Sequence, residues 1–129
     1  MKYPHLLLAI CGSLLSCQNT GQQELLGKWQ LTATLIDIGD GQGTYTESNS
    51  GKTIEFLADG SVVCNGTLCG IGGEIGQESK GVYTLDEGKI VPECCDPAAL
   101  PIQFQLTGDE LILNYSCIEA CGEKYRKAQ

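Results

Sequence analysis

The chain has 129 residues, and its eight basic and sixteen acidic residues give a formal net charge of −8 at pH 7. This acidity disfavours binding to nucleic acid, because that affinity comes largely from cations that contact phosphates. The one histidine, His5, lies near the N-terminus, so a domain that starts after it has no Ser-His or Cys-His pair for nucleophilic catalysis. We expect no enzyme activity and no cofactor.

The N-terminal segment has the pattern of a secretory signal. Lys2 is basic, and residues 6–15 form an apolar run far shorter than the roughly 20 residues of a membrane-spanning helix. The run ends in Leu-Leu-Ser-Cys, residues 14–17, which resembles the lipobox of bacterial lipoproteins. The resemblance implies cleavage before Cys17, whose thiol and amine become acylated, palmitate being one such acyl group. The alternative is an ordinary signal peptide with a chance cysteine.

Three segments follow from this interpretation: a signal peptide (1–16), a lipidated polar tether (17–23) and a single domain (24–129). Cleavage removes Lys2 and makes the chain one charge more negative, so electrostatics do not favour binding to anionic lipid. Attachment to the bilayer would come from the acyl chains on Cys17, and several chains hold better than one. We expect a lipid-anchored protein of the cell envelope, in the outer membrane.

After the tether, apolar and polar residues alternate with the period of two that predicts strands. In residues 25–36, Trp29 and Leu31 fall on one face, with Gln30 and Thr32 on the other. Pairs such as Asp59-Gly60 are typical of hairpin turns. The pattern predicts one strand in 25–36, hairpins in 52–64, 80–93 and 101–115, and a last strand in 122–128.

Eight short strands joined mostly by tight turns predict an all-β fold. A small, closed, antiparallel up-and-down barrel is favoured, because closure removes both exposed edges of a sheet. A β-sandwich of two four-stranded sheets is the alternative. Large inward-facing residues on nearly every strand favour a filled interior, although a barrel of eight strands also has room for one small ligand.

The stretches "LLGKWQL", "IEFLADGSV", "GVYTL" and "LILNYSC" together resemble the lipocalin-like domains of bacterial lipoproteins, over residues 24–127. Gly27 and Trp29 match the Gly-x-Trp of the first lipocalin strand, and Arg126 matches the late basic residue that packs on the tryptophan. The resemblance implies an open barrel mouth that binds a small apolar ligand. This chain is shorter than a typical lipocalin, and it has additional cysteines.

The chain has eight cysteines, and the six that follow Cys11 and Cys17 lie in the domain. This even number predicts disulfides in a small exported chain. Zinc is the alternative, but the domain lacks histidine and the usual C-x2-C spacing, so we expect no metal. In the predicted meander all six lie at one end of the barrel. We expect Cys64–Cys69, with Cys94 and Cys95 paired to Cys117 and Cys121 in an order that is left open; the six are Cys64, Cys69, Cys94, Cys95, Cys117 and Cys121.

The sequence leaves two classes of function open. The lipocalin resemblance implies a binding module that takes a small apolar ligand at the barrel mouth. A filled barrel instead predicts a structural or protein-interaction module, such as an inhibitor, whose disulfide-linked end contacts an envelope protein or an external protease. Neither expectation includes nucleic acid as a partner.

Overall fold

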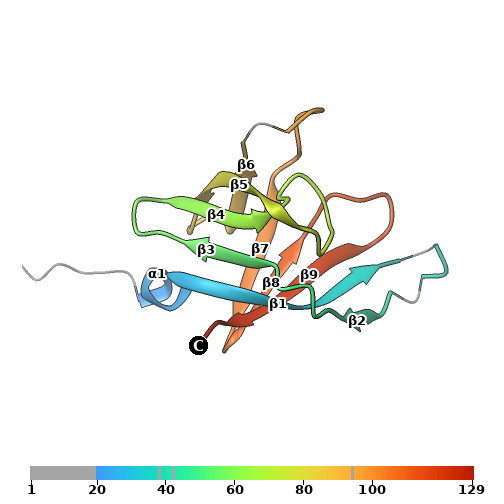
Figure 1. Cartoon of the computed structure of the whole chain (residues 1–129), viewed down its shortest axis with the longest axis horizontal. Coiled ribbons are helices and arrows are strands. Elements are labelled where there is room, and N and C mark those ends of the chain that lie inside the picture. The colour runs from blue at the N-terminus through green and yellow to red at the C-terminus, as the bar shows by residue number, and fades with distance from the viewer. Residues whose placement is uncertain (1–19, 38, 42, 94) are drawn as a thin grey trace, which may run out of the picture.

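A computed structural model describes residues 20–129 apart from residues 38, 42 and 94. The predicted signal peptide, the lipidated Cys17 and Cys94 lie outside the described residues. Within them the chain is all-β and forms a closed eight-stranded antiparallel barrel, which confirms the predicted fold (Figure 1). No helix in this part of the chain has both the length and the apolar character needed to cross a membrane.

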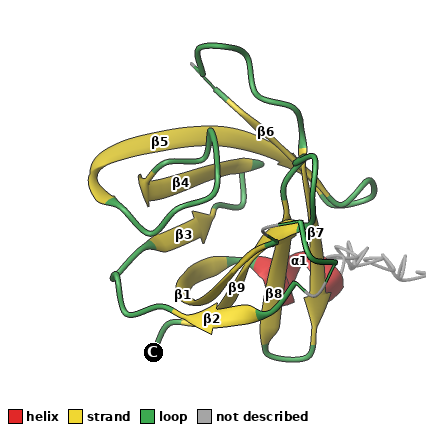
Figure 2. Ribbon diagram, turned by 90° about the vertical axis from the view of Figure 1, so that its right-hand side faces the viewer, coloured by secondary structure: helices red, strands yellow, loops and turns green. Residues whose placement is uncertain are grey.

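The barrel is a meander in which consecutive strands pair and β1 closes the ring by pairing with β9. All eight predicted strands are present, with one further short strand, β2, that lies beside β1 (Figure 2). The elements are α1 (Thr20–Leu25), β1 (Gly27–Ile36), β2 (Tyr45–Glu47), β3 (Thr53–Phe56), β4 (Ser61–Gly66), β5 (Ile75–Thr84), β6 (Lys89–Pro92), β7 (Ile102–Thr107), β8 (Glu110–Asn114) and β9 (Cys121–Lys127).

Strand β1 changes its partner halfway along its length. Its first half pairs with β3, where Trp29 faces Ile54, and its second half pairs with β2, where Thr34 faces Thr46. Strand β9 follows the opposite edge of β1 over both halves. The barrel therefore closes through β3 and β9, and β2 extends the sheet beyond the barrel at the far end of β1.

Large apolar side chains fill the interior. The ring of Phe56 lies at the centre of an aromatic group, 5.2 Å from the ring of Tyr83 and 5.8 Å from that of Phe104, both in edge-to-face geometry. Apolar side chains from the other barrel strands and from α1 pack around this group, and most are less than 2% exposed. The alternation of the sequence thus produces a packed core along the barrel axis.

Helix α1 covers the end of the barrel from which the chain enters. Leu25 is buried there, and its carbonyl accepts a hydrogen bond of 2.8 Å from the indole Nε1 of Trp29. Residues 20–23, which we expected to belong to a flexible tether, form the start of this helix. Six residues are too few for a helix to be stable alone, so tertiary contacts hold it in place.

The basic residue on Trp29 is Lys127, so the prediction of Arg126 was wrong. Lys127 Nζ lies 4.6 Å from the centre of the indole ring and donates hydrogen bonds to the carbonyls of Glu24 and Leu26. In the register of β1 and β9, Trp29 faces Lys127 and Gln30 faces Arg126, so Arg126 points to the opposite face. Gly27 has φ +108°, a backbone conformation that favours glycine, and it lies next to the side chain of Lys127.

Candidate functional site

Four connections meet at the end of the barrel opposite α1, as the meander predicts. The disulfide Cys69–Cys95 joins the β4–β5 and β6–β7 connections. A hydrogen bond of 3.0 Å from the amide of Asp37 to the carbonyl of Ala120 joins the β1–β3 and β8–β9 connections. We call these connections, with the strand residues that adjoin them, the rim: residues 36–52, 67–75, 93–101 and 115–120.

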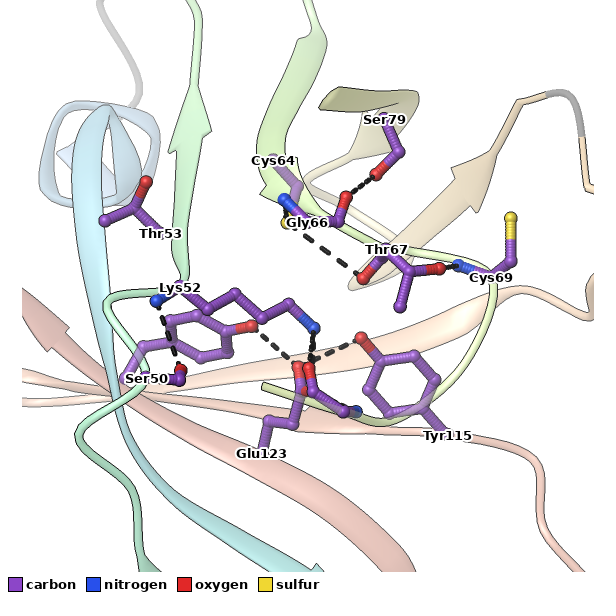
Figure 3. Close-up of polar contacts among 12 residues, drawn as sticks. Ser50, Lys52, Thr53, Cys64, Gly66, Thr67, Cys69, Ser79, Tyr115 and Glu123 are labelled. Atoms are coloured by element: carbon purple, nitrogen blue, oxygen red, sulfur yellow. Dashed lines mark hydrogen bonds and ion pairs between the residues drawn. The ribbon is translucent and has the colours of Figure 1, made fainter. Parts of the chain in front are cut away.

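A buried ion pair joins the last residue of the first rim segment to strand β9. The ammonium of Lys52, just before β3, is 2.8 Å from Oε1 of Glu123 in β9, and both side chains are fully buried (Figure 3). Burying two charges carries a large desolvation cost, which is offset when the geometry is good and the remaining polar atoms are hydrogen-bonded. The surroundings of Glu123 therefore decide whether this pair is stable.

Every oxygen of the Glu123 carboxylate is satisfied. Oε1 accepts from Lys52 and from the amide of Gly72 at 3.1 Å, and Oε2 accepts from the hydroxyls of Tyr115 at 3.0 Å and Tyr125 at 2.6 Å. Lys52 Nζ also donates to the carbonyl of Gly72 at 2.8 Å. The described residues contain no buried side-chain nitrogen or oxygen that lacks a hydrogen-bond partner. A complete network of this kind is rigid.

This network closes the barrel mouth. Both backbone polar groups of Gly72 are bound from below, by Lys52 and Glu123, so the β4–β5 connection is held across the mouth. We call this arrangement the Gly72 latch. The latch was not predicted from the sequence, although Glu123 lies between Cys121 and Tyr125 in the inward alternation of β9. A charged residue at an inward position was the signal that pointed to a buried partner.

The latch alters the titration of two tyrosines. Burial raises the pKa of Tyr115 and that of Tyr125 well above the ordinary value, and the nearby negative charge of Glu123 raises both further. The folded state thus favours the neutral phenols, whereas unfolded tyrosines ionise near pH 10.

We therefore expect the free energy of unfolding to be unaffected by these groups below about pH 10 and to fall as the pH rises above it. Denaturant unfolding at a series of alkaline pH values, with tyrosinate absorbance followed in parallel, measures this. In the Tyr115→Phe variant, the absorbance curve should lose one phenol that ionises above about pH 10. If the buried phenols ionise near pH 10 while the chain stays folded, the network does not surround them.

The cysteines pair differently from the prediction. Cys69 bonds to Cys95, and Cys117 bonds to Cys121, with Cα–Cα distances of 5.6 and 6.0 Å. The predicted Cys64–Cys69 bond was wrong, because Cys64 is a free, buried thiol. The predicted pairing of Cys95 with Cys117 or Cys121 was also wrong, because Cys95 bonds to Cys69 and the other two bond to each other. Cys64 follows Val62 in the inward alternation of β4, so it faces the core, whereas Cys69 lies in the connection beyond. Burial raises the pKa of the Cys64 thiol and keeps it protonated.

Loss of the Cys69–Cys95 disulfide should cost more stability than loss of Cys117–Cys121. The bonded cysteines are 26 residues apart in the first and 4 in the second, and a longer closed loop restricts the unfolded chain more. We expect the Cys69→Ser, Cys95→Ser variant to lose about 3–4 kcal/mol and the Cys117→Ser, Cys121→Ser variant about 2 kcal/mol. Denaturant unfolding compares the two variants. The reverse order would contradict this account of the rim.

Exposed large apolar side chains collect on the rim. Ile36 is 62% exposed, Ile75 54%, Leu100 67% and Ile118 fully exposed, so each of the four rim segments carries one. The remaining two, Val82 and Val91, face each other across β5 and β6 on the outer wall of the barrel. Among the described residues, the turns at the opposite end carry none. Apolar groups thus distinguish the rim from the end covered by α1.

A surface hollow lies outside the barrel wall, beside the Cys69–Cys95 disulfide. Its volume is about 540 Å³, and it is lined by the β4–β5 connection and the first half of β5, together with Gly66 and Glu93. The described residues contain no group of three or more histidine, cysteine, aspartate or glutamate side chains that could hold a metal ion.

Comparison of the chain with models of protein families, with curated proteins and with solved structures gave no match in any of the three. The resemblance to lipocalin-like domains remains a prediction from Gly27, Trp29 and the strand pattern.

Proposed function

We propose that the chain is a lipid-anchored lipoprotein of the cell envelope, whose filled barrel presents its rim to a partner protein. The proposed lipid anchor is supported by the signal-like segment and by Cys17 in the lipobox-like Leu-Leu-Ser-Cys. With the tether joined to α1, the rim lies at the far end of the barrel and would face away from the bilayer. This orientation leaves the rim accessible to a second protein.

The observation that carries the proposal is the set of exposed apolar side chains on the rim. Ile36, Ile75, Leu100 and Ile118 come from four separate segments that meet at one end. Scattered exposed apolar residues are ordinary, but their concentration on one surface is typical of protein interaction sites. The disulfides and the Gly72 latch hold these segments in place, which lowers the entropy lost on binding.

A ligand inside the barrel finds less support. The aromatic group around Phe56 occupies the centre of the barrel, and the buried pair of Lys52 and Glu123 with Gly72 closes the mouth. The small apolar ligand implied by the lipocalin resemblance stays a prediction, and the packing of these residues favours docking at the rim instead.

The anchor is tested with the Cys17→Ser variant of the full chain. The variant should lose metabolic labelling with palmitate and should leave the membrane fraction. Unchanged labelling and membrane association would reject lipidation at Cys17.

The rim is tested by photo-crosslinking in the protein's own cells. A benzoyl-phenylalanine at position 100, on the rim, should give a discrete crosslinked protein, and the same probe at position 86, in the turn between β5 and β6, should not. Co-expression of an excess of the chain without the probe should suppress the crosslink. Equal crosslinking from both positions, or none from position 100, would refute docking through the rim.

A further inference from the structure

We infer that the ring closed by Cys117 and Cys121 makes the main contact between the rim and its partner. Ile118 inserts into an apolar pocket of the partner, and the surface around this pocket is basic. The inference rests on the proposed docking function and specifies the contact and the chemistry of the partner. Three observations carry it: the exposure of Ile118, the bonds that fix the ring, and the charges of the rim.

Ile118 is fully exposed, more than any other large apolar side chain among the described residues. It lies between two cysteines that are four residues apart and joined by a disulfide, so its backbone has little freedom. Residues on both sides of it, Cys117 and Glu119, are exposed as well. A large apolar side chain that projects from a constrained ring gains buried area on binding and loses little entropy.

Three contacts with the rest of the fold fix the ring. The carbonyl of Ala120 accepts from the amide of Asp37, and Cys121 faces Ile36 in the register of β1 and β9. Tyr115, just before the ring, donates its hydroxyl to Glu123 in the Gly72 latch. The ring is therefore attached to the buried network below it and to β1 beside it. A ring that is already held in place loses less conformational entropy when it binds a partner.

The charges of the rim indicate the chemistry of the partner. The rim contains seven acidic residues, and its one basic residue, Lys52, is buried against Glu123. By contrast, Arg126 and Lys127 lie at the end covered by α1. A surface that presents negative charge around apolar anchors is complementary to a basic surface, because opposite potentials steer and orient association. The seven acidic residues are Asp37, Asp40, Glu47, Glu74, Glu93, Asp96 and Glu119.

The contact is tested by substitution at Ile118 with the crosslinking probe at position 100, which lies on another rim segment. Ile118→Asp should lower the crosslink yield at position 100 by about tenfold or more. Val91→Asp, the matched control on the outer wall, should leave the yield within about twofold, because exposed residues outside an interface contribute little. If Ile118→Asp leaves the crosslink yield at position 100 unchanged, the ring does not make the main contact with the partner. Docking at the rim would still stand.

The charge is tested with the same probe. The Asp96→Lys, Glu119→Lys variant should lower the yield, and the Asp86→Lys, Glu87→Lys variant at the opposite end should not. Raising the salt concentration in permeabilised cells from about 0.05 to 0.5 M should also lower the yield, because salt screens exposed charges. An unchanged or higher yield in both tests would overturn the basic partner. No crosslink from the unsubstituted rim would refute the proposed function, and this inference with it.

Discussion

Glu123→Ala should lower the free energy of unfolding by about 3–5 kcal/mol, because it leaves the Lys52 ammonium buried without its counter-charge. It also removes the acceptor for the amide of Gly72 and for two tyrosine hydroxyls, each of which would be left without that hydrogen bond. The measurement is equilibrium unfolding in denaturant at neutral pH. The Gly72 latch should open in this variant, which amide hydrogen exchange at residues 67–74 would detect.

The matched control is Glu110→Ala. Glu110 Oε1 lies 3.9 Å from Lys124 Nζ, and both side chains are partly exposed, so loss of Glu110 should cost about 0–1 kcal/mol. The Lys52→Met, Glu123→Leu variant should recover only part of the stability that Glu123→Ala loses. It removes the unpaired ammonium, but it still leaves the amide of Gly72 and the hydroxyls of Tyr115 and Tyr125 without their acceptor. A cost for Glu123→Ala no greater than that for Glu110→Ala would show that the carboxylate is not buried as described.

Phe56→Ala should lower the free energy of unfolding by about 3–5 kcal/mol, through lost burial and through the cavity left behind. Phe56 is 1% exposed and contacts the rings of Tyr83 and Phe104, so the deletion removes the centre of the core. Val91→Ala, at a side chain 48% exposed, is the control and should change stability by no more than about 0.5 kcal/mol. Thermal and denaturant unfolding measure both variants.

The same variant tests whether the native interior is filled. A new apolar cavity in a packed core binds small apolar molecules such as benzene. We expect Phe56→Ala to gain benzene binding that the unsubstituted chain lacks, as measured by the benzene-dependent shift in melting temperature. A loss of stability similar to that of Val91→Ala, or equal benzene binding by both chains, would mean that the barrel centre is open before the substitution.

The barrel was predictable because its signals are local. Alternation fixes which residues face inward, and turn pairs such as Asp59-Gly60 set the hairpins, so the eight strands follow from short windows of sequence. Strand β2 was missed because its three residues, Tyr45–Glu47, are too few to show a period. Its formation depends on the free edge of β1, which the sequence does not display.

Two errors in the candidate site, at Arg126 and at Cys64, have one physical origin, the face on which a side chain lies. Inward alternation along β9 passes through Glu123, Tyr125 and then Lys127, so Lys127 and not Arg126 reaches Trp29. Cys64 likewise follows Val62 inward, where it is buried as a free thiol. Both corrections were available from the alternation. The pairing of Lys52 with Glu123 was not, because the two are 71 residues apart and meet through the closure of the barrel.

We propose that this barrel acts through its rim and not through its interior. Native mass spectrometry of the full chain, released from its own envelope in a mild detergent, distinguishes the two. We expect the mass of the lipidated chain, alone or with a partner protein, and no small molecule within the barrel. A stoichiometric small apolar molecule that stays bound through detergent exchange, and that dissociates when Phe56 or Glu123 is substituted, would contradict it.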